Sequence, residues 1–266
     1  MQQARVVRIS IAPVKSLGLV HPDEVVLERH GVPGNRRFWL VDHGGRLINN
    51  KRVGPLVRIA PEWDEETRVL TLTFPDGTHV SGVVELGAPV DAEMYGHPHP
   101  SHRVVGPWED AIARFAGRRL TLLYADDHAV DRGYRGGSVS LVSRASLERL
   151  RAEAGADAPV DGRRFRMLFE IDGVGAHEED EWLGAPVRVG EATLALNGVV
   201  GRCVVTSHDP DTGVTDLDTL GTLARYRREG PGEPLPFGVY GAVAVPGRVR
   251  VGDAVEPLHD RLLAAT

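Results

Sequence analysis

Short apolar runs separated by turn residues constrain the fold of this chain more than any other feature of its sequence. The apolar run at 69–73 ends at Phe74-Pro75-Asp76-Gly77-Thr78, which is typical of a turn between two strands. The chain has 31 glycines and 18 prolines among 266 residues, about 18% against roughly 12% in an average protein. Because stretches with helical spacing are few and short, the pattern predicts a β-rich α+β fold.

Three stretches nevertheless show helical signals. Each places apolar residues on one face at helical spacing, and two of them follow a residue that can cap a helix N-terminus. The stretches are Trp108, Ile112 and Phe115 before Gly117; Leu147 and Leu150 after Ser143; and Leu220, Leu223 and Tyr226 after Asp218. We therefore expect a few short helices within a mainly β structure.

The length of the chain fits two domains better than one core. We expect a boundary at residue 100, with one domain over 1–100 and a second over 101–266. The run His97-Pro98-His99-Pro100-Ser101-His102 lies at this boundary and, because prolines alternate with histidines, it is expected to be an extended linker. Three histidines also suggest a metal site, but such a linker would preorganise its ligands poorly.

Charge and cysteine content exclude several classes of function. The net charge of −6 argues against sequence-independent binding of nucleic acid. The sequence has no apolar run of membrane-spanning length and no apolar signal core at its start, so we expect a cytoplasmic protein without a membrane partner. A single cysteine excludes an intrachain disulfide and a cysteine-ligated iron–sulfur cluster. Any redox partner must therefore be a separate protein.

The one cysteine, Cys203, lies in a run that suits chemistry. Arg202 precedes it, and the polar turn Asp209-Pro210-Asp211-Thr212-Gly213 follows shortly after. A neighbouring guanidinium lowers a thiol pKa, and a thiolate ligates soft metals or attacks electrophiles. A lone cysteine beside Val204 and Val205 is equally consistent with a small apolar residue in a strand. The residues alone leave both interpretations open.

The run from Arg202 to Gly213 resembles the signature around the molybdenum-ligating cysteine of the MOSC (molybdenum cofactor sulfurase C-terminal) domain family. The resemblance is to the amidoxime-reducing branch, which has an N-terminal β-barrel domain. Further motifs of this branch occur in the same order: Pro13-Val14-Lys15-Ser16, Arg37-Phe38-Trp39-Leu40-Val41, Phe165-Arg166, Glu179-Asp180-x-Trp182, Leu220-x-x-Leu223-x-x-Tyr226-Arg227, Phe237-Gly238-Val239-Tyr240 and Val251-Gly252-Asp253-x-Val255. The resemblance implies a small N-terminal β-barrel domain followed by a MOSC β-barrel domain with a few short helices.

The resemblance also implies a site. Cys203 would be the catalytic residue and the ligand to molybdenum in a molybdopterin cofactor. The residues that would bind this cofactor are Lys15, Ser16, Arg37, Ser143, Arg166, Arg202 and Tyr240. Arg36, Arg163 and Arg164 are expected at the surface, and the loop at 228–236 is expected to form the rim of the pocket.

The function implied is the reduction of N-hydroxylated compounds such as amidoximes and hydroxylamines, by transfer of an oxygen atom to molybdenum. A separate protein of the ferredoxin or flavoprotein type would supply the electrons. Two alternatives remain: a carrier of persulfide sulfur on Cys203, and a protein that binds a ligand without catalysis. One departure from the branch bears on this choice, since Leu168 stands where the relatives have asparagine.

Overall fold

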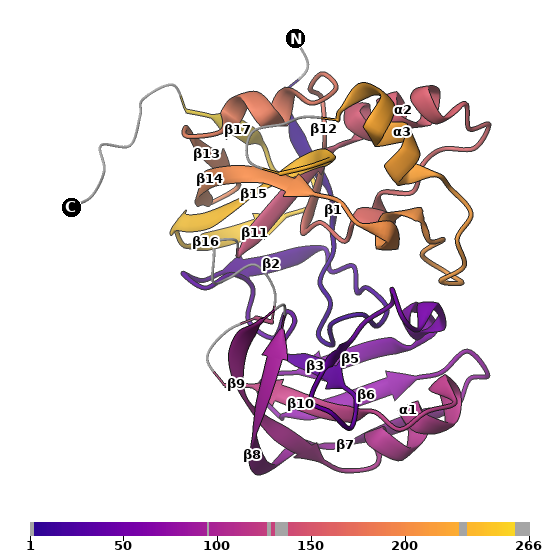
Figure 1. Cartoon of the computed structure of the whole chain (residues 1–266). Helices are drawn as coiled ribbons and strands as arrows, with labels where there is room; N and C mark the ends of the chain where they lie inside the picture. Colours follow the sequence, from indigo (N-terminus) through magenta and orange to yellow (C-terminus); the bar gives the residue numbers. More distant parts are fainter. Residues whose placement is uncertain (1–2, 95, 127–128, 131–137, 229–232, 259–266) are drawn as a thin grey trace.

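The computed structural model describes residues 3–94, 96–126, 129–130, 138–228 and 233–258, which form an upper and a lower lobe (Figure 1). The upper lobe contains a seven-stranded sheet in the order β1 (Arg5–Ile9), β12 (Phe169–Asp172), β11 (Val139–Ser143), β15 (Pro236–Val245), β14 (Ala192–Gly201), β13 (Pro186–Val189) and β17 (Val255–Pro257). Strands β2 (Glu24–Leu27) and β16 (Gly247–Arg250) pair with each other beside it. Neighbouring strands are antiparallel except β11 and β12.

Two smaller sheets build the lower lobe. One has the order β4 (Leu47–Ile48), β3 (Phe38–Val41), β10 (Thr121–Ala125), β9 (His97–Val105) and β8 (Glu85–Met94), and the other has β5 (Ala60–Asp64), β6 (Val69–Thr73) and β7 (His79–Val83). Strands make up 43% of the structure and helix 19%, which confirms the predicted β-rich α+β fold.

The helices are short and lie around the sheets. The α-helices are α1 (Trp108–Ala116), α2 (Arg144–Ala154) and α3 (Thr219–Tyr226), and single turns of 3₁₀-helix are η1 (Gly54–Arg58), η3 (Gly162–Phe165), η4 (Glu178–Trp182) and η5 (Val204–Ser207). The capping predictions are confirmed. The Ser143 side chain accepts a hydrogen bond from the backbone N–H of Ser146, and that of Asp218 accepts one from the backbone N–H of Gly221.

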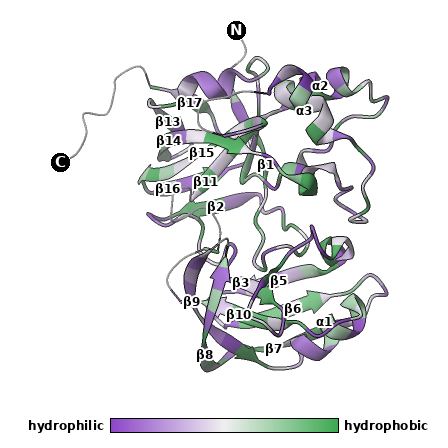
Figure 2. Cartoon of the chain, viewed as in Figure 1, coloured by the Kyte–Doolittle hydropathy of each residue, from purple (hydrophilic) through white to green (hydrophobic). Residues whose placement is uncertain are grey.

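Each lobe has its own apolar core. Val6, Phe169 and Val239 belong to the core of the upper lobe, whereas Phe38 and Trp108 belong to that of the lower lobe. Figure 2 shows hydrophobic segments along β6 and β14, while β8 and β9 are largely hydrophilic. The burial pattern of β8 agrees, because most of its residues are exposed. The two lobes therefore meet along a seam rather than through a shared core.

The expected boundary at residue 100 falls inside β9, which lies between β8 and β10 in one sheet. The run at 97–102 is therefore a strand and not a linker. His99 and Ser101 point into the lobe, whereas Pro98 and Pro100 are exposed, the alternation that a half-buried strand requires. In the described part of the chain no group of three or more histidine, cysteine or acidic side chains could hold a metal.

Gly238 in β15 marks a close approach between strands beside the candidate site. Its φ of +72° is a backbone conformation that favours glycine, and a Cβ there would lie 2.8 Å from the Leu141 carbonyl oxygen and 2.9 Å from Met167 Cε. Gly77 has a similar φ of +82°, but a Cβ there would meet nothing within 4 Å. A comparison of substitutions at Gly77 and Gly238 therefore separates the cost of backbone strain from the cost of steric overlap.

We expect Gly77→Ala to lower the free energy of unfolding by about 1–2 kcal/mol through the left-handed backbone alone. Gly238→Ala should cost about 1–3 kcal/mol more, because the added methyl group also overlaps the neighbouring strand. Urea denaturation followed by circular dichroism measures both values. Equal losses in the two variants would contradict the close packing described for β15.

Candidate functional site

A cavity of about 800 Å³ lies between the lobes and contains Cys203 in its wall. The lower lobe and the segment that leads into it contribute Lys15, Ser16 and Arg36, and the upper lobe contributes Arg166, Arg202 and Tyr240. The cavity is large enough for a cofactor or a drug-sized ligand. Because its wall comes from both lobes, their relative position determines its shape.

Cys203 lies between the end of β14 at Gly201 and the start of η5. Its backbone is extended (φ −133°, ψ 173°), and its side chain is partly exposed. The Cys203 carbonyl accepts hydrogen bonds of 3.0 Å from both the backbone N–H and the side-chain hydroxyl of Thr206. The turn that follows therefore fixes the backbone from which the thiol projects.

Arg202 holds this end of β14 in place. Its Nε donates to the Phe237 carbonyl at 2.8 Å, its Nη1 to the Phe165 carbonyl at 3.1 Å, and its Nη2 to Met167 Sδ at 2.9 Å. The guanidinium carbon also lies 5.1 Å from the centre of the Phe165 ring. These contacts join β14, β15 and η3 beside Cys203, so Arg202 positions the thiol as well as lining the cavity.

Arg36 and Arg166 bring positive charge from the two sides of the seam. Arg36 Nη2 donates to the Arg166 carbonyl at 2.9 Å, and Arg166 Nη2 donates to the Leu17 carbonyl at 2.8 Å. Burial, together with the charge of Arg36, lowers the pKa of Arg166 to about 9. A bound anion would reverse this cost, so the pair is suited to binding one.

Arg37 was predicted to line the cavity, but in the structure its neighbour Arg36 does so. Arg37 does not line the cavity; its Nε donates to Tyr124 Oη at 3.0 Å and its guanidinium carbon lies 4.9 Å from the centre of that ring. The chain turns at Arg36, which has a left-handed φ of +54°, and the sequence pattern did not show which of the two consecutive arginines faces the cavity. The surface position predicted for Arg36 is therefore wrong.

Ser143 is also absent from the cavity wall. It is fully buried at the start of α2, where its hydroxyl accepts from Ser146 N at 3.1 Å and its own N–H donates to Glu179 Oε1. Burial raises the pKa of the Glu179 carboxyl. Helix capping accounts for Ser143. The other six predicted residues line the cavity: Lys15, Ser16, Arg166, Arg202, Cys203 and Tyr240.

Two of these six depend on special backbone positions. Ser16 is buried with a φ of +78°, which turns the chain just after Lys15. The ring of Tyr240 lies over Gly198, where a Cβ would come within 3.0 Å of the ring and of the hydroxyl oxygen. Leu168, at the departure from the branch pattern, contributes to the cavity wall and to the apolar core of the upper lobe.

The cavity wall is strongly cationic although the whole chain carries a net charge of −6. Among the described residues, seven lysines and arginines line it and one carboxylate, Glu233, does so. The seven are Lys15, Arg29, Arg36, Lys51, Arg164, Arg166 and Arg202. Sequence reasoning missed Arg29 and Lys51, because no motif distinguishes them from solvated residues. Residues 229–232 of the predicted rim loop lie outside the described residues, and Glu233 of the same loop lines the cavity.

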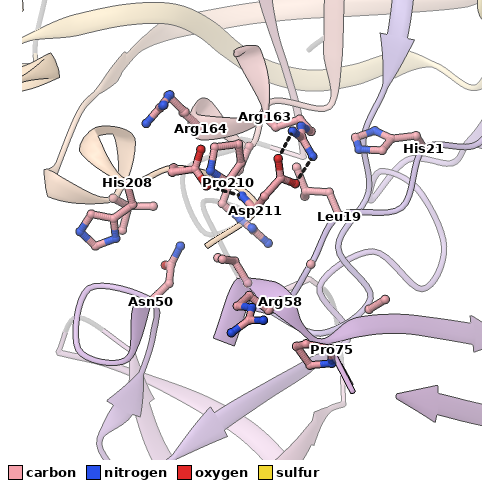
Figure 3. A pocket seen from close by; sticks show the side chains of 16 residues that line it. Leu19, His21, Asn50, Arg58, Pro75, Arg163, Arg164, His208, Pro210 and Asp211 are labelled. Carbon is pink, nitrogen blue, oxygen red and sulfur yellow. Dashed lines mark hydrogen bonds and ion pairs between the residues drawn. The ribbon is translucent and has the colours of Figure 1, made fainter. Parts of the chain in front are cut away.

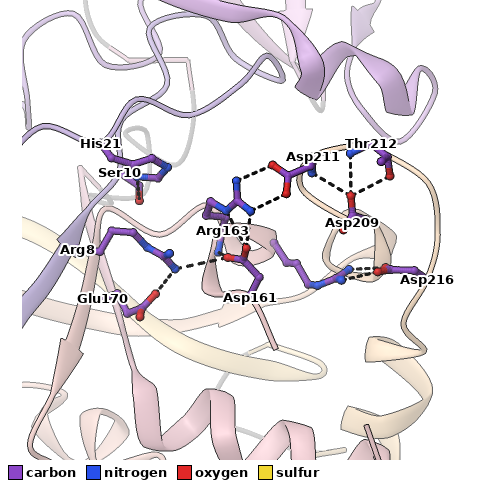
Figure 4. A network of polar contacts seen from close by, with 11 residues as sticks. Arg8, Ser10, His21, Asp161, Arg163, Glu170, Asp209, Asp211, Thr212 and Asp216 are labelled. Carbon is purple, nitrogen blue, oxygen red and sulfur yellow. Dashed lines mark hydrogen bonds and ion pairs between the residues drawn. The ribbon is translucent and has the colours of Figure 1, made fainter. Parts of the chain in front are cut away.

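Arg163 and Arg164 fix the loop that follows Cys203, which corrects their predicted surface role. Arg163 makes two hydrogen bonds to Asp211, at 2.7 and 2.8 Å, and Arg164 makes two to Asp216, at 2.5 and 2.6 Å (Figure 4). The Arg164 side chain is only 9% exposed. Planar two-point pairing of this kind fixes geometry as well as charge. The loop therefore has a defined position relative to Cys203.

A second cavity of about 290 Å³ adjoins the larger one and is lined by Arg163, Arg164 and Arg166 (Figure 3). It shares Asn50, Arg164, Arg166 and Val205 with the larger cavity. Figure 3 shows Asn50 and Arg58 of the lower lobe opposite Pro210 of the loop. Nearby, a Cβ on Gly54 would lie 2.2 Å from the Gly213 carbonyl oxygen, so the backbones of the two lobes touch here.

Comparisons with known proteins agree with this architecture. The family described as MOSC N-terminal beta barrel domain matches residues 3–120, and the family described as MOSC domain matches residues 130–256. Mitochondrial amidoxime-reducing component 1 of Mus musculus is 38% identical over 96% of this chain and 82% of its own length. The Homo sapiens protein of the same name is 28% identical over 96% and 83%.

More distant relatives include a molybdenum cofactor sulfurase of Drosophila willistoni, which is 23% identical over 89% of this chain but only 30% of its own length. The crystal structure of the YUAD protein from Bacillus subtilis aligns with a TM-score of 0.44 and 13% identity over 96% of this chain and 94% of that one. Both domain families match in order, and a relative 38% identical spans nearly the whole sequence. The chain therefore belongs to the MOSC family, in the group that carries an N-terminal β-barrel domain.

Proposed function

We propose that this chain binds a molybdenum cofactor of the molybdopterin type in the large cavity and reduces N-hydroxylated compounds such as amidoximes. The observation that carries this proposal is the composition of the cavity wall, in which the described residues supply seven lysines and arginines, one carboxylate and the only thiol of the sequence. The relatives named amidoxime-reducing component support the reaction class.

The residues present fit such a group. A pterin dithiolene cofactor carries a phosphate and needs cationic donors, and Arg36 and Arg166 supply them from the two sides of the seam. The Ser138 hydroxyl and Arg164 Nε are buried without a hydrogen-bond partner among the described residues, and both residues line the cavity. Buried polar atoms require partners. A polar ligand in the cavity would provide them.

Each protein group then has a distinct task. Cys203 would hold molybdenum through its sulfur, since a thiolate is a soft ligand. Arg202 holds the backbone on which the thiol depends, through the carbonyls of Phe165 and Phe237. Lys15, Ser16 and Tyr240 would contact the pterin or phosphate from the wall. When bound, the molybdenum centre exchanges an oxygen atom and two electrons with a substrate.

The overall reaction is balanced by a reductant from outside the chain. An amidoxime takes up two electrons and two protons, its N–O bond breaks, and an amidine and water are released. One cysteine cannot ligate an iron–sulfur cluster, so we infer a separate donor protein of the ferredoxin or flavoprotein type. No helix in the described part of the chain is long and apolar enough to cross a membrane. A cytoplasmic location stays a prediction.

We expect one molybdenum per chain in protein purified from a host that makes the cofactor. Cys203→Ser should keep the fold but lose molybdenum and amidoxime reduction, because a hydroxyl is a poor ligand for this metal. Circular dichroism measures the fold, elemental analysis with pterin fluorescence measures the cofactor, and formation of amidine from an amidoxime measures the activity. Molybdenum in the Cys203→Ser variant at wild-type level, or full reductase activity, would contradict the assignment. Protein with wild-type sulfur transfer and no metal would instead favour the persulfide carrier.

Arg36→Ala and Arg166→Ala should each weaken retention of the cofactor by roughly 10- to 150-fold. A charge-assisted hydrogen bond contributes about 1.5–3 kcal/mol, and 1.4 kcal/mol corresponds to a factor of ten. Arg37→Ala is the matched control, because Arg37 is adjacent in sequence but contacts Tyr124 outside the cavity. Pterin and molybdenum contents after gel filtration give the result. Loss in Arg37→Ala equal to that in Arg36→Ala would show that the cavity is not the site.

The cofactor-loaded chain should reduce benzamidoxime when a chemical reductant supplies electrons, and it should not do so with NADH alone. The reason is that the sequence contains neither the cysteines of a cluster nor a recognisable flavin motif. Turnover is measured by chromatography as the amount of benzamidine formed over time. Sustained turnover with NADH and the purified chain would reveal a redox site within it.

A further inference from the structure

The second cavity is lined by Arg58 and His208, neither of which lines the large cavity. Arg58 is the last residue of η1 in the lower lobe, and His208 follows η5 in the loop after Cys203. Figure 3 shows both side chains, together with Asn50, around this cavity. A ligand bound there would therefore contact both lobes.

The imidazole of His208 has a polar atom that the described part of the chain does not satisfy. Its Nδ1 is buried and has no hydrogen-bond partner among the described residues. Buried polar atoms normally have a partner, and an imidazole Nδ1 that carries a proton donates to an acceptor oxygen. Asn50 lines the same cavity although it is only 5% exposed, so a second polar side chain borders this space. An acceptor group in the cavity would supply the missing partner.

Positive charge exceeds negative charge in the wall of this cavity. Its charged side chains, apart from histidines, are four arginines and two aspartates: Arg58, Arg163, Arg164, Arg166, Asp209 and Asp211. Asp211 is paired with Arg163, and Asp209 Oδ1 accepts a hydrogen bond of 3.0 Å from the backbone N–H of Asp211. Within the described part of the chain, Arg58 and Arg166 form no ion pair with a carboxylate. The cavity is therefore suited to an anion.

We propose that the second cavity binds a phosphate group, either as free phosphate or as the end of a small organic ester. A phosphate has acceptor oxygens that point in several directions, so donors from opposite walls can bind it together. Arg58 would donate from the lower lobe and His208 from the loop after Cys203. Leu19, Val57 and Pro75 also line the cavity and provide an apolar wall for a short organic group.

This site is distinct from the proposed cofactor site, although the two cavities share part of their walls. A phosphate held by Arg58 and His208 would link the lobes close to the place where the backbones of Gly54 and Gly213 touch. Because the ligand binds the folded arrangement of both lobes, its binding stabilises that arrangement by mass action.

Isothermal titration calorimetry in phosphate-free buffer tests the proposal on the purified full chain, with inorganic phosphate and phenyl phosphate as the two probes. Arg58→Ala and His208→Ala should each weaken binding about tenfold, as expected for one charge-assisted hydrogen bond. Arg52→Ala is the matched control, since Arg52 is exposed and lines neither cavity. Tighter binding of phenyl phosphate would identify an ester as the ligand, and equal binding would identify free phosphate. If neither probe binds saturably, or if Arg58→Ala binds both as tightly as wild type, the proposal is wrong.

Thermal unfolding provides a second readout. The better probe should raise the Tm of the wild type, and it should raise the Tm of Arg58→Ala less at the same concentration. Sodium chloride at equal ionic strength controls for screening, which acts on both proteins alike. Because neither Arg58 nor His208 lines the large cavity, the comparison holds whether or not that cavity contains molybdenum. Equal shifts of Tm in the two proteins would overturn the proposal and leave the proposed reductase untouched.

Discussion

The cavity of this protein depends on arginine side chains that donate to backbone carbonyls of neighbouring segments. Arg36 donates to the Arg166 carbonyl, Arg166 to that of Leu17, and Arg202 to those of Phe165 and Phe237. A carbonyl acceptor fixes the direction of a guanidinium and carries no formal charge of its own. The seam between the lobes can therefore hold concentrated positive charge in a fixed geometry, at the cost of burial that the lowered pKa of Arg166 records.

A second set of arginines pairs with carboxylates. Arg163 pairs with Asp211 and Arg164 with Asp216, and these ion pairs fix the loop after Cys203. These two residues are separated from Arg166 by a single phenylalanine. One short segment thus supplies both the scaffold of the loop after Cys203 and a cation for the cavity. The sequence alone does not show which arginine fixes the loop and which lines the cavity. That depends on the group to which each guanidinium donates its hydrogen bonds in the folded chain.

The fold could be predicted well because it depends on local patterns. Alternation and turn residues gave the strands. Apolar stripes gave the helices that begin at Trp108, Arg144 and Thr219, the last two with a capping residue before them. The predicted linker at 97–102 was wrong because proline at 98 and 100 suggested an extended connection, whereas His99 and Ser101 alternate with them as the buried residues of β9. Prolines on the exposed side of a strand look the same in sequence as prolines in a linker.

The site could be predicted only in part. Cys203, Arg166 and Tyr240 carry a motif and line the cavity, but Arg36, Lys51 and Glu233 carry none. Their positions depend on contacts between segments far apart in sequence, such as the approach of Glu233 to Gly201. The choice between Arg36 and Arg37 depends on the turn at Arg36, where φ is +54°. Such facts follow from tertiary packing, which no local pattern encodes.

The place of β1 at the edge of the upper sheet has a consequence for how the chain can be divided. Arg5–Ile9 pairs with β12, although the intervening chain passes through the whole lower lobe before it returns. In the sequence, the lower lobe is therefore inserted between two parts of the upper lobe. A fragment that begins after residue 130 would lack Val6 and Ile9 from its core and would expose the unpaired edge of β12, a template for aggregation. The stretch matched by the MOSC domain family, residues 130–256, thus lacks one strand of the sheet that it forms in this chain.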